Sequence, residues 1–137
     1  MHSINDKNLK VLHLNARGFT QSKIDNFEAF LKSLQVIPDV ICFTETWFDL
    51  NNQKQSNLTG YNSYHLVRTS RQHGGVTLYV KEQLNCHQIQ DLSFINEDIE
   101  INTIKVNVNS IQFVICGIYR PRFKHDRVEV LINFYQI

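Results

Sequence analysis

The alternation of apolar and polar stretches predicts two buried strands separated by a helix near the start of the chain. Residues 9–14 are mostly apolar, and residues 40–43 are entirely apolar, as expected of strands inside a sheet. Between them, apolar side chains recur at helical spacing after Ser22, which forms a capping box with Asp25. A strand, a helix and a second strand in this order predict two parallel neighbours.

After residue 60 the pattern changes to short extended stretches with connections too short for helices. A polar run rich in Asn and Gln, residues 49–60, precedes them and predicts a surface loop. The pairs Gly74-Gly75 and Asn109-Ser110 indicate turns, and such short connections predict antiparallel pairing. The four expected strands are residues 61–68, 76–80, 104–108 and 112–119.

The last two of these strands differ in their expected surroundings. Residues 104–108 alternate apolar with polar, which indicates one solvated face, whereas residues 113–118 are apolar throughout and indicate a central strand. Ile99 and Ile101 are out of phase with the alternation, which favours a bulge or a strand start near Asn102.

Composition predicts one domain without a strong overall charge. The chain has 137 residues, 42% of them hydrophobic, which is enough for a real core. The net charge of +1 gives no general attraction to nucleic acid or membrane, so any phosphate preference must be local. Cys42, Cys86 and Cys116 lack metal-ligand or disulfide spacing and are expected to be reduced. With no signal-like or membrane-span-length segment, we expect an intracellular protein of the nucleus or cytoplasm with no membrane partner.

Residues with candidate chemistry follow directly after the first two apolar runs. Open α/β sheets bind their ligands at such strand ends. Glu45 follows residues 40–43, and a carboxylate there can hold a hard cation such as Mg²⁺, which keeps waters for a substrate phosphate. Asn15 ends the neighbouring strand, so its amide is expected to reach the same metal or a phosphate oxygen. The alternatives are a solvated glutamate and a turn-forming asparagine.

A second group of polar residues closes the strand expected to be central. Tyr119 and Arg120 precede Pro121, and a phenol and a guanidinium there can bind phosphate oxygens or simply anchor the rim. Trp47 can stack on a base or cap the core. Two loops expected beside the end of this strand are rich in basic residues. They either follow a nucleic-acid backbone or carry solvated charge. Their basic residues are Arg68, Arg71, His73, Arg122, Lys124 and Arg127.

Taken in order, these motifs resemble the endonuclease/exonuclease/phosphatase superfamily, most closely the apurinic-endonuclease-like domain of non-LTR retrotransposons. The matching pieces are Asn15, Glu45-Thr46-Trp47, Gly74-Gly75-Val76, Glu100 and Gly117-Ile118-Tyr119-Arg120-Pro121. The resemblance implies a four-layered α/β sandwich that hydrolyses phosphodiesters with Mg²⁺, or with Mn²⁺. In that family the domain nicks DNA so that a linked reverse transcriptase can prime there.

The resemblance also implies a role for each matching residue. Glu45 would be the metal ligand with Asn15 beside it in the metal site, and Tyr119 would contact the phosphate or the transition state. These three would form the catalytic set. The implied substrate-binding residues are Arg17, Trp47 and Arg120.

Two segments of the family pattern do not occur in these 137 residues: Gly-Asp-Phe-Asn and Ser-Asp-His. His125-Asp126 has suitable residue types in reversed order and is rejected as a substitute, and Arg122 stands where a second proline is usual. Loss of general acid–base catalysis costs roughly 10²–10⁴-fold in rate. We therefore expect a truncated domain that is inactive alone, with a tail at residues 1–8 and the N-terminal half of the sandwich, including a mixed sheet, at residues 9–137.

The same comparison predicts the partners of the chain. The family packs two sheets face to face, and we expect this chain to supply essentially one of them and to end in a helix at residues 126–137. An uncovered inner face would expose apolar side chains and favour self-association. The other expected partners are DNA, the missing C-terminal half and the linked reverse transcriptase.

Three functions are consistent with this sequence. The first is a Mg²⁺-dependent endonuclease domain of retrotransposon type. The second is a non-catalytic remnant that binds nucleic acid or protein. The third is a phosphoesterase for small molecules or lipid headgroups on the same fold.

Overall fold

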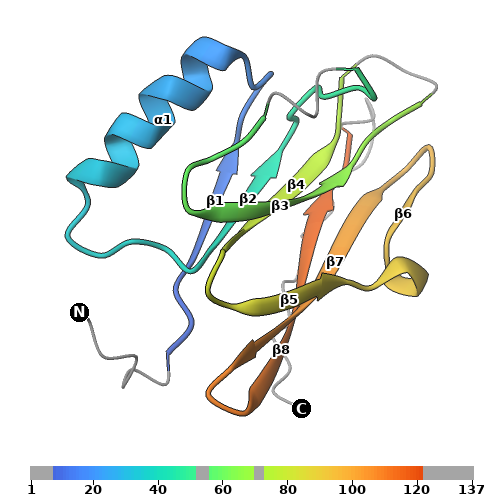
Figure 1. The fold of residues 1–137 in the computed structure, drawn as a ribbon. Helices are drawn as coiled ribbons and strands as arrows, with labels where there is room; N and C mark the ends of the chain where they lie inside the picture. The colour runs from blue at the N-terminus through green and yellow to red at the C-terminus, as the bar shows by residue number, and fades with distance from the viewer. Residues whose placement is uncertain (1–7, 52–55, 70–72, 122–137) are drawn as a thin grey trace.

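The structure, a computed structural model, describes residues 8–51, 56–69 and 73–121 (Figure 1). Its first elements are β1 (Val11–Asn15), α1 (Gln21–Ser33), β2 (Val40–Thr44), β3 (Tyr61–Leu66) and β4 (Val76–Lys81). They are followed by β5 (Asn85–Gln88), the 3-10 helix η2 (Gln90–Leu92), β6 (Phe94–Ile95), β7 (Glu100–Val108) and β8 (Ile111–Tyr119). The helix predicted at residues 126–137 lies outside the described residues.

The strands form two four-stranded sheets. In the first sheet the order is β1-β2-β4-β3, with β1 and β2 parallel and the other pairs antiparallel. The second sheet has β7 at its centre, with β5 and β6 on one edge and β8 on the other, all antiparallel. The predicted α/β class and mixed sheet are confirmed. The expectation of essentially one sheet is wrong.

A shared apolar core lies between the two sheets (Figure 1). It draws on β2 and β4 from the first sheet and on β7 and β8 from the second. Its buried members are Val40, Cys42, Val76, Leu78, Val80, Ile104, Val106, Val108 and Ile115. The inner face of the first sheet is therefore covered by the second, and the reason given for self-association does not hold. Self-association itself stays a prediction.

A second core lies on the outer face of the first sheet, under α1 (Figure 1). The ring of Phe27 packs edge-on against that of Phe43, with 4.9 Å between their centroids. The predicted surface loop contributes to this core, since Ser56 and Leu58 are buried and the hydroxyl of Tyr79 donates to the carbonyl of Ser56 at 2.6 Å. Only part of that loop is therefore on the surface.

Helix α1 begins two residues earlier than a cap at Ser22 would place it. The N-cap is Thr20, whose backbone is extended and whose hydroxyl oxygen accepts from the backbone N–H of Lys23 at 3.4 Å. Ser22 lies inside the helix, and Asp25 accepts a hydrogen bond from the side chain of Gln21 at 2.8 Å. Both Thr20 and Ser22 can cap a helix, so the pattern alone did not separate them.

Two strands expected inside the fold lie at edges of their sheets. Among the described strands β1 pairs only with β2, and its Val11 and Leu14 are 42% and 36% exposed, so it is not buried as predicted. Strand β8 pairs only with β7 among the described residues. Of the residues of β8, only Ile115 and Gly117 are buried. Within the part of the chain that the structure describes, β8 is an edge strand, so the prediction of a central strand at residues 113–118 is wrong there.

No bulge interrupts β7. Its pairing with β8 runs in regular register from Glu100 opposite Tyr119 to Val108 opposite Ile111. Glu100 and Asn102 are fully buried and occupy inner positions that the sequence pattern reserves for apolar residues. The strand therefore starts at Glu100, and the change of phase comes from buried polar side chains. At its other end, Asn109 and Ser110 form the predicted turn with φ of 49° and 67°.

The three cysteines are free thiols, with Cys42 buried, Cys86 partly buried and Cys116 exposed. Burial raises the pKa of Cys42 to about 12, because the thiolate would lose its hydration. Among the described residues, none of the helices has the length and apolar character that crossing a membrane requires.

His65 in β3 is held neutral by its surroundings. Its ring lies against the rings of Phe48 and Tyr79, and its nitrogens lie 3.1 Å from Oγ of Ser56 and 2.9 Å from Oγ1 of Thr77. Burial lowers the pKa of His65 from 6.5 to about 4, since the charged imidazolium would lose its hydration.

We expect this residue to remove about 2 kcal/mol from the free energy of unfolding between pH 7 and pH 5. The unfolded chain binds a proton at His65 below pH 6.5, whereas the folded chain does so only near pH 4. Stability is therefore full above pH 6.5 and falls as the pH drops toward 4. Urea denaturation at the two pH values measures the effect. His65→Gln should remove most of it and substitution of the exposed His87 should not, and equal pH dependence in all three proteins would contradict this account.

Candidate active site

The ends of β1, β2 and β8 meet at one end of the two sheets. The side-chain amide of Asn15, at the end of β1, donates to Oε1 of Glu45 at 2.9 Å. The phenol of Tyr119, at the end of β8, lies close enough to the carboxylate of Glu45, just after β2, for that carboxylate to raise the pKa of the phenol. The three residues predicted as the catalytic set are therefore brought together, and their catalytic roles stay predictions.

The loop that carries Glu45 has an unusual backbone held from two sides. Glu45 and Trp47 adopt left-handed conformations with φ of 53° and 58°, each of which costs a non-glycine residue about 1–2 kcal/mol. The backbone N–H of Gly18 donates to the carbonyl of Glu45 at 2.8 Å, and that of Trp47 donates to the carbonyl of Gly74 at 2.9 Å. Such strain persists only where the surrounding structure fixes it.

The loop after β1 is held in a similar way. Oδ1 of Asn15 accepts from the backbone N–H of Arg17 at 3.0 Å, which leaves the amide N–H group for Glu45. The ammonium of Lys23 donates to the carbonyls of Ala16, Arg17 and Gly18 at 3.0, 2.9 and 2.7 Å. In this arrangement Asn15 orients the carboxylate of Glu45, and its part in holding a metal stays a prediction.

Tyr119 is kept in its neutral form. Burial raises the pKa of its phenol most, and the negative charge and hydrogen bond of Glu45 raise it further, as does the charge of Glu100. The nearby guanidinium of Arg68 opposes this rise. A neutral phenol can donate a hydrogen bond to a carboxylate or to a phosphate oxygen.

The residues predicted to bind substrate lie around this group. Trp47 is 41% exposed and its ring centroid lies 4.4 Å from that of His73, so it lies at the rim while the neighbouring Phe48 is buried. Arg17 is exposed and Arg120 is partly buried at the end of β8. Four of the predicted loop cations lie outside the described residues: Arg71, Arg122, Lys124 and Arg127.

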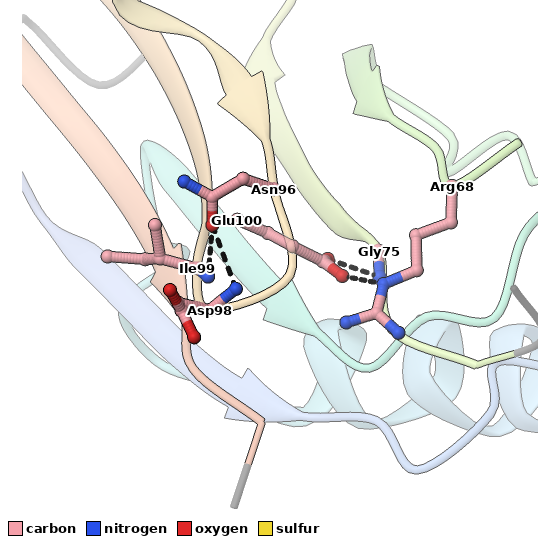
Figure 2. A network of polar contacts seen from close by, with 6 residues as sticks. All are labelled: Arg68, Gly75, Asn96, Asp98, Ile99 and Glu100. Carbon is pink, nitrogen blue, oxygen red and sulfur yellow. Dashed lines mark hydrogen bonds and ion pairs between the residues drawn. The ribbon is translucent and has the colours of Figure 1, made fainter. Parts of the chain in front are cut away.

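Glu100 and Arg68 form a buried pair that sequence reasoning did not foresee (Figure 2). Glu100 has no exposed side-chain surface, and its Oε1 accepts from Nε of Arg68, whose side chain is 12% exposed. Its Oε2 accepts from the backbone N–H of Gly75 at 2.6 Å. Arg68 is therefore neither a solvated loop charge nor an open phosphate contact, as its position among basic residues implied.

The donor atoms at this site suit a hard divalent cation held by one protein carboxylate. Glu45 is partly exposed, whereas the nearby Glu100 is committed to Arg68 and Gly75. Within residues 8–51, 56–69 and 73–121, no group of three or more His, Cys, Asp or Glu side chains is placed to hold a metal. Mg²⁺ binds through one or two carboxylates and keeps several waters, so Glu45 fits as one ligand of such an ion.

The model of the endonuclease/exonuclease/phosphatase family matches residues 12–131, which is most of the chain. The chain belongs to this family. A search of curated proteins found no match. Enzymes of the endonuclease/exonuclease/phosphatase family hydrolyse phosphoesters, and they generally depend on a metal ion. Glu45, Asn15 and Tyr119 all lie within the matched residues.

Proposed function

We propose that this chain carries part of a Mg²⁺-dependent DNA endonuclease site of the type linked to reverse transcriptases in non-LTR retrotransposons, with Mn²⁺ as an alternative ion. The observation that supports this most is the convergence of Asn15, Glu45 and Tyr119 at three strand ends, with Asn15 hydrogen-bonded to Glu45 and Tyr119 close to its charge. Family membership supports phosphoester hydrolysis. The motifs from Glu45-Thr46-Trp47 to Tyr119-Arg120-Pro121 support the endonuclease type.

Each residue of the group has a distinct part in this proposal. Glu45 holds the ion, Asn15 fixes the orientation of the carboxylate, and Tyr119 donates its phenolic proton in a hydrogen bond to a phosphate oxygen. A divalent ion bound here supplies positive charge to the phosphate and lowers the pKa of bound water. The left-handed backbone of Glu45 fixes the carboxylate before substrate arrives.

The rim supports a nucleic acid as the substrate class. Trp47 offers a partly exposed ring beside His73, and stacking of a base on an aromatic ring contributes about 1–3 kcal/mol. Arg17, two residues after Asn15, and Arg120, directly after Tyr119, add positive charge. The 137 residues contain neither the Gly-Asp-Phe-Asn nor the Ser-Asp-His segment, so we propose that alone they bind DNA without cutting it.

Trp47 is the one tryptophan of the chain, so its fluorescence reports on the Glu45 loop. We expect a saturable change in emission when Mg²⁺ or Mn²⁺ is added, and at least about a tenfold weaker affinity in Glu45→Gln, which removes the charged ligand. Glu82→Gln, on the exposed turn after β4, is the matched control and should bind as the wild type does. A wild type without a saturable change, or a Glu45→Gln protein that responds equally, would contradict the metal site.

A supercoiled-plasmid assay tests the reaction itself. We expect salt-sensitive DNA binding and no nicking above that of Glu45→Ala, whether or not Mg²⁺ is present. Mg²⁺-dependent nicking that is lost in Glu45→Ala would show that these residues suffice for catalysis. Hydrolysis of an inositol phosphate or phospholipid in preference to DNA would favour the small-molecule phosphoesterase instead.

A further inference from the structure

The proposed reaction does not use a buried polar connection that joins Glu100 to Arg68 and Gly75 (Figure 2). Its centre is Glu100, which Figure 2 shows with both carboxylate oxygens directed at Arg68 and Gly75. Strand β7 supplies Glu100, while Arg68 and Gly75 flank the connection between β3 and β4. The carboxylate therefore ties the second sheet to a loop of the first.

The same loop of the first sheet holds the backbone beside Glu45. The carbonyl of Gly74 accepts from the N–H of Trp47 at 2.9 Å, and the N–H of Thr46 lies 3.5 Å from the carbonyl of Gly75. These bonds lead in two steps from the carboxylate of Glu100 to the residues that follow Glu45. A shift of the Gly74-Gly75 segment would therefore move the Glu45 loop.

Glu100 also borders the other side of the site. It is paired directly opposite Tyr119 across β7 and β8, and its charge contributes to the raised pKa of that phenol. Glu100 is thus linked to the Glu45 loop through Gly75 and is paired directly with Tyr119, so it lies between the two sides of the site.

Two simpler roles fit these observations less well. As a phosphate contact, Arg68 would be poor, since its side chain is only 12% exposed and its charge is matched by Glu100. Stability alone does not explain the pair well, because replacing a buried ion pair by well-packed apolar residues of the same volume often leaves a protein equally stable or more stable. The pair does fix the position of two backbone segments: Gly75, which bonds to the carboxylate of Glu100, and the start of β7, which carries Glu100.

We infer that Glu100 is a positioning residue of the Glu45 site, with Arg68 as its counter-ion. Its carboxylate holds Gly75, Gly75 and Gly74 hold the backbone of Thr46 and Trp47, and this backbone keeps Glu45 left-handed and directed at Tyr119. The expected effect on metal affinity rests on the proposed metal-binding role of Glu45. The expected effect on the position of the Glu45 loop rests on the backbone contacts alone.

The test compares wild type, Glu100→Gln and a matched variant by Mn²⁺ affinity, acrylamide quenching of Trp47 and thermal stability. The matched variant is Asn102→Ala. Asn102 is also fully buried, lies two residues along β7, and donates to the carbonyls of Tyr64 and Val76 at 2.9 and 3.1 Å. Glu100→Gln leaves one amide oxygen where two carboxylate oxygens accept from Arg68 and Gly75, and Asn102→Ala removes another buried tie between the sheets. Only Glu100 bonds to the segment that holds the Glu45 loop.

We expect Glu100→Gln to weaken Mn²⁺ binding by about tenfold, as loss of a group that orients a metal ligand typically does, and to make Trp47 more accessible to acrylamide. Asn102→Ala should lower the melting temperature without either change. A Glu100→Gln protein with wild-type Mn²⁺ affinity and wild-type quenching would overturn the inference. So would an Asn102→Ala protein that shows the same two changes.

Failure of the proposed function gives a different result. If the wild type and Glu45→Gln bind Mn²⁺ equally, the metal role of Glu45 fails, and the quenching of Trp47 in Glu100→Gln still decides whether Glu100 fixes the loop. If Glu100→Gln does not fold, the double variant Arg68→Met with Glu100→Met takes its place, because it removes both charges and also the acceptor for the N–H of Gly75. Unchanged quenching in that folded double variant would overturn the inference.

Discussion

Replacing Gly74 with alanine should destabilise the fold by about 4 kcal/mol, a large part of the roughly 5–15 kcal/mol that typically separates the folded from the unfolded state. Gly74 has φ of 73°, which alone costs a residue with a side chain about 1 kcal/mol or more. An added Cβ would also lie 2.4 Å from Nε of Arg68 and 2.5 Å from Oε1 of Glu100. The methyl group would therefore separate the buried pair as well as strain the backbone.

Gly60→Ala separates these two contributions. Gly60 has φ of 85°, and a Cβ there would meet nothing within 4 Å, so only the backbone cost of about 1 kcal/mol applies. Urea denaturation of both variants, with equal dependence of the free energy on urea, measures the difference. If Gly74→Ala were no less stable than Gly60→Ala, the close approach of Arg68 and Glu100 to Gly74 would be refuted.

The sequence predicted the strands best where apolar residues and turns agree. Residues 40–43 became the fully buried β2, and Asn109-Ser110 became the turn between β7 and β8, because each pattern has few other structural solutions. Strand β5, with the sequence Asn-Cys-His-Gln, was not predicted, since it has no apolar run and gains its place by pairing with β7. Apolar content also misled for β1 and β8, because a strand's own residues do not say how many neighbours it has.

The candidate site was predictable in part for a geometric reason. The carboxyl ends of β1 and β2 meet because the strands are parallel and adjacent, so a residue at each end, Asn15 and Glu45, was bound to lie close. No such rule joins Arg68 to Glu100, which are 32 residues apart: Arg68 lies in the loop after β3 of the first sheet, and Glu100 begins β7 of the second. Both were noticed for their charge or motif, but their pairing depends on how the sheets pack, and side-chain patterns in one strand do not determine that.

Removing the cation of the buried pair should cost nearly as much stability as separating it. Arg68→Met keeps an apolar chain of similar length but leaves the carboxylate of Glu100 fully buried, with the N–H of Gly75 as its remaining partner among the residues that the structure describes. Breaking a buried ion pair in this way typically costs about 3–5 kcal/mol, and we expect a loss in that range. Lys32→Met, in the last turn of α1, removes an exposed charge of the same sign and should change stability by less than about 1 kcal/mol.

The double variant Arg68→Met with Glu100→Gln shows whether the cost comes from the unpaired charge. Its glutamine keeps an oxygen for the N–H of Gly75 but carries no charge, so no uncompensated ion remains inside the protein. We therefore expect the double variant to be more stable than Arg68→Met alone by about 1–3 kcal/mol, a gain that two independent substitutions cannot produce. Urea denaturation of the single and double variants gives this coupling energy directly. If the double variant were instead the less stable by the sum of the two single effects, Arg68 and Glu100 would be acting independently, and the loop beside Glu45 would owe its position to other contacts.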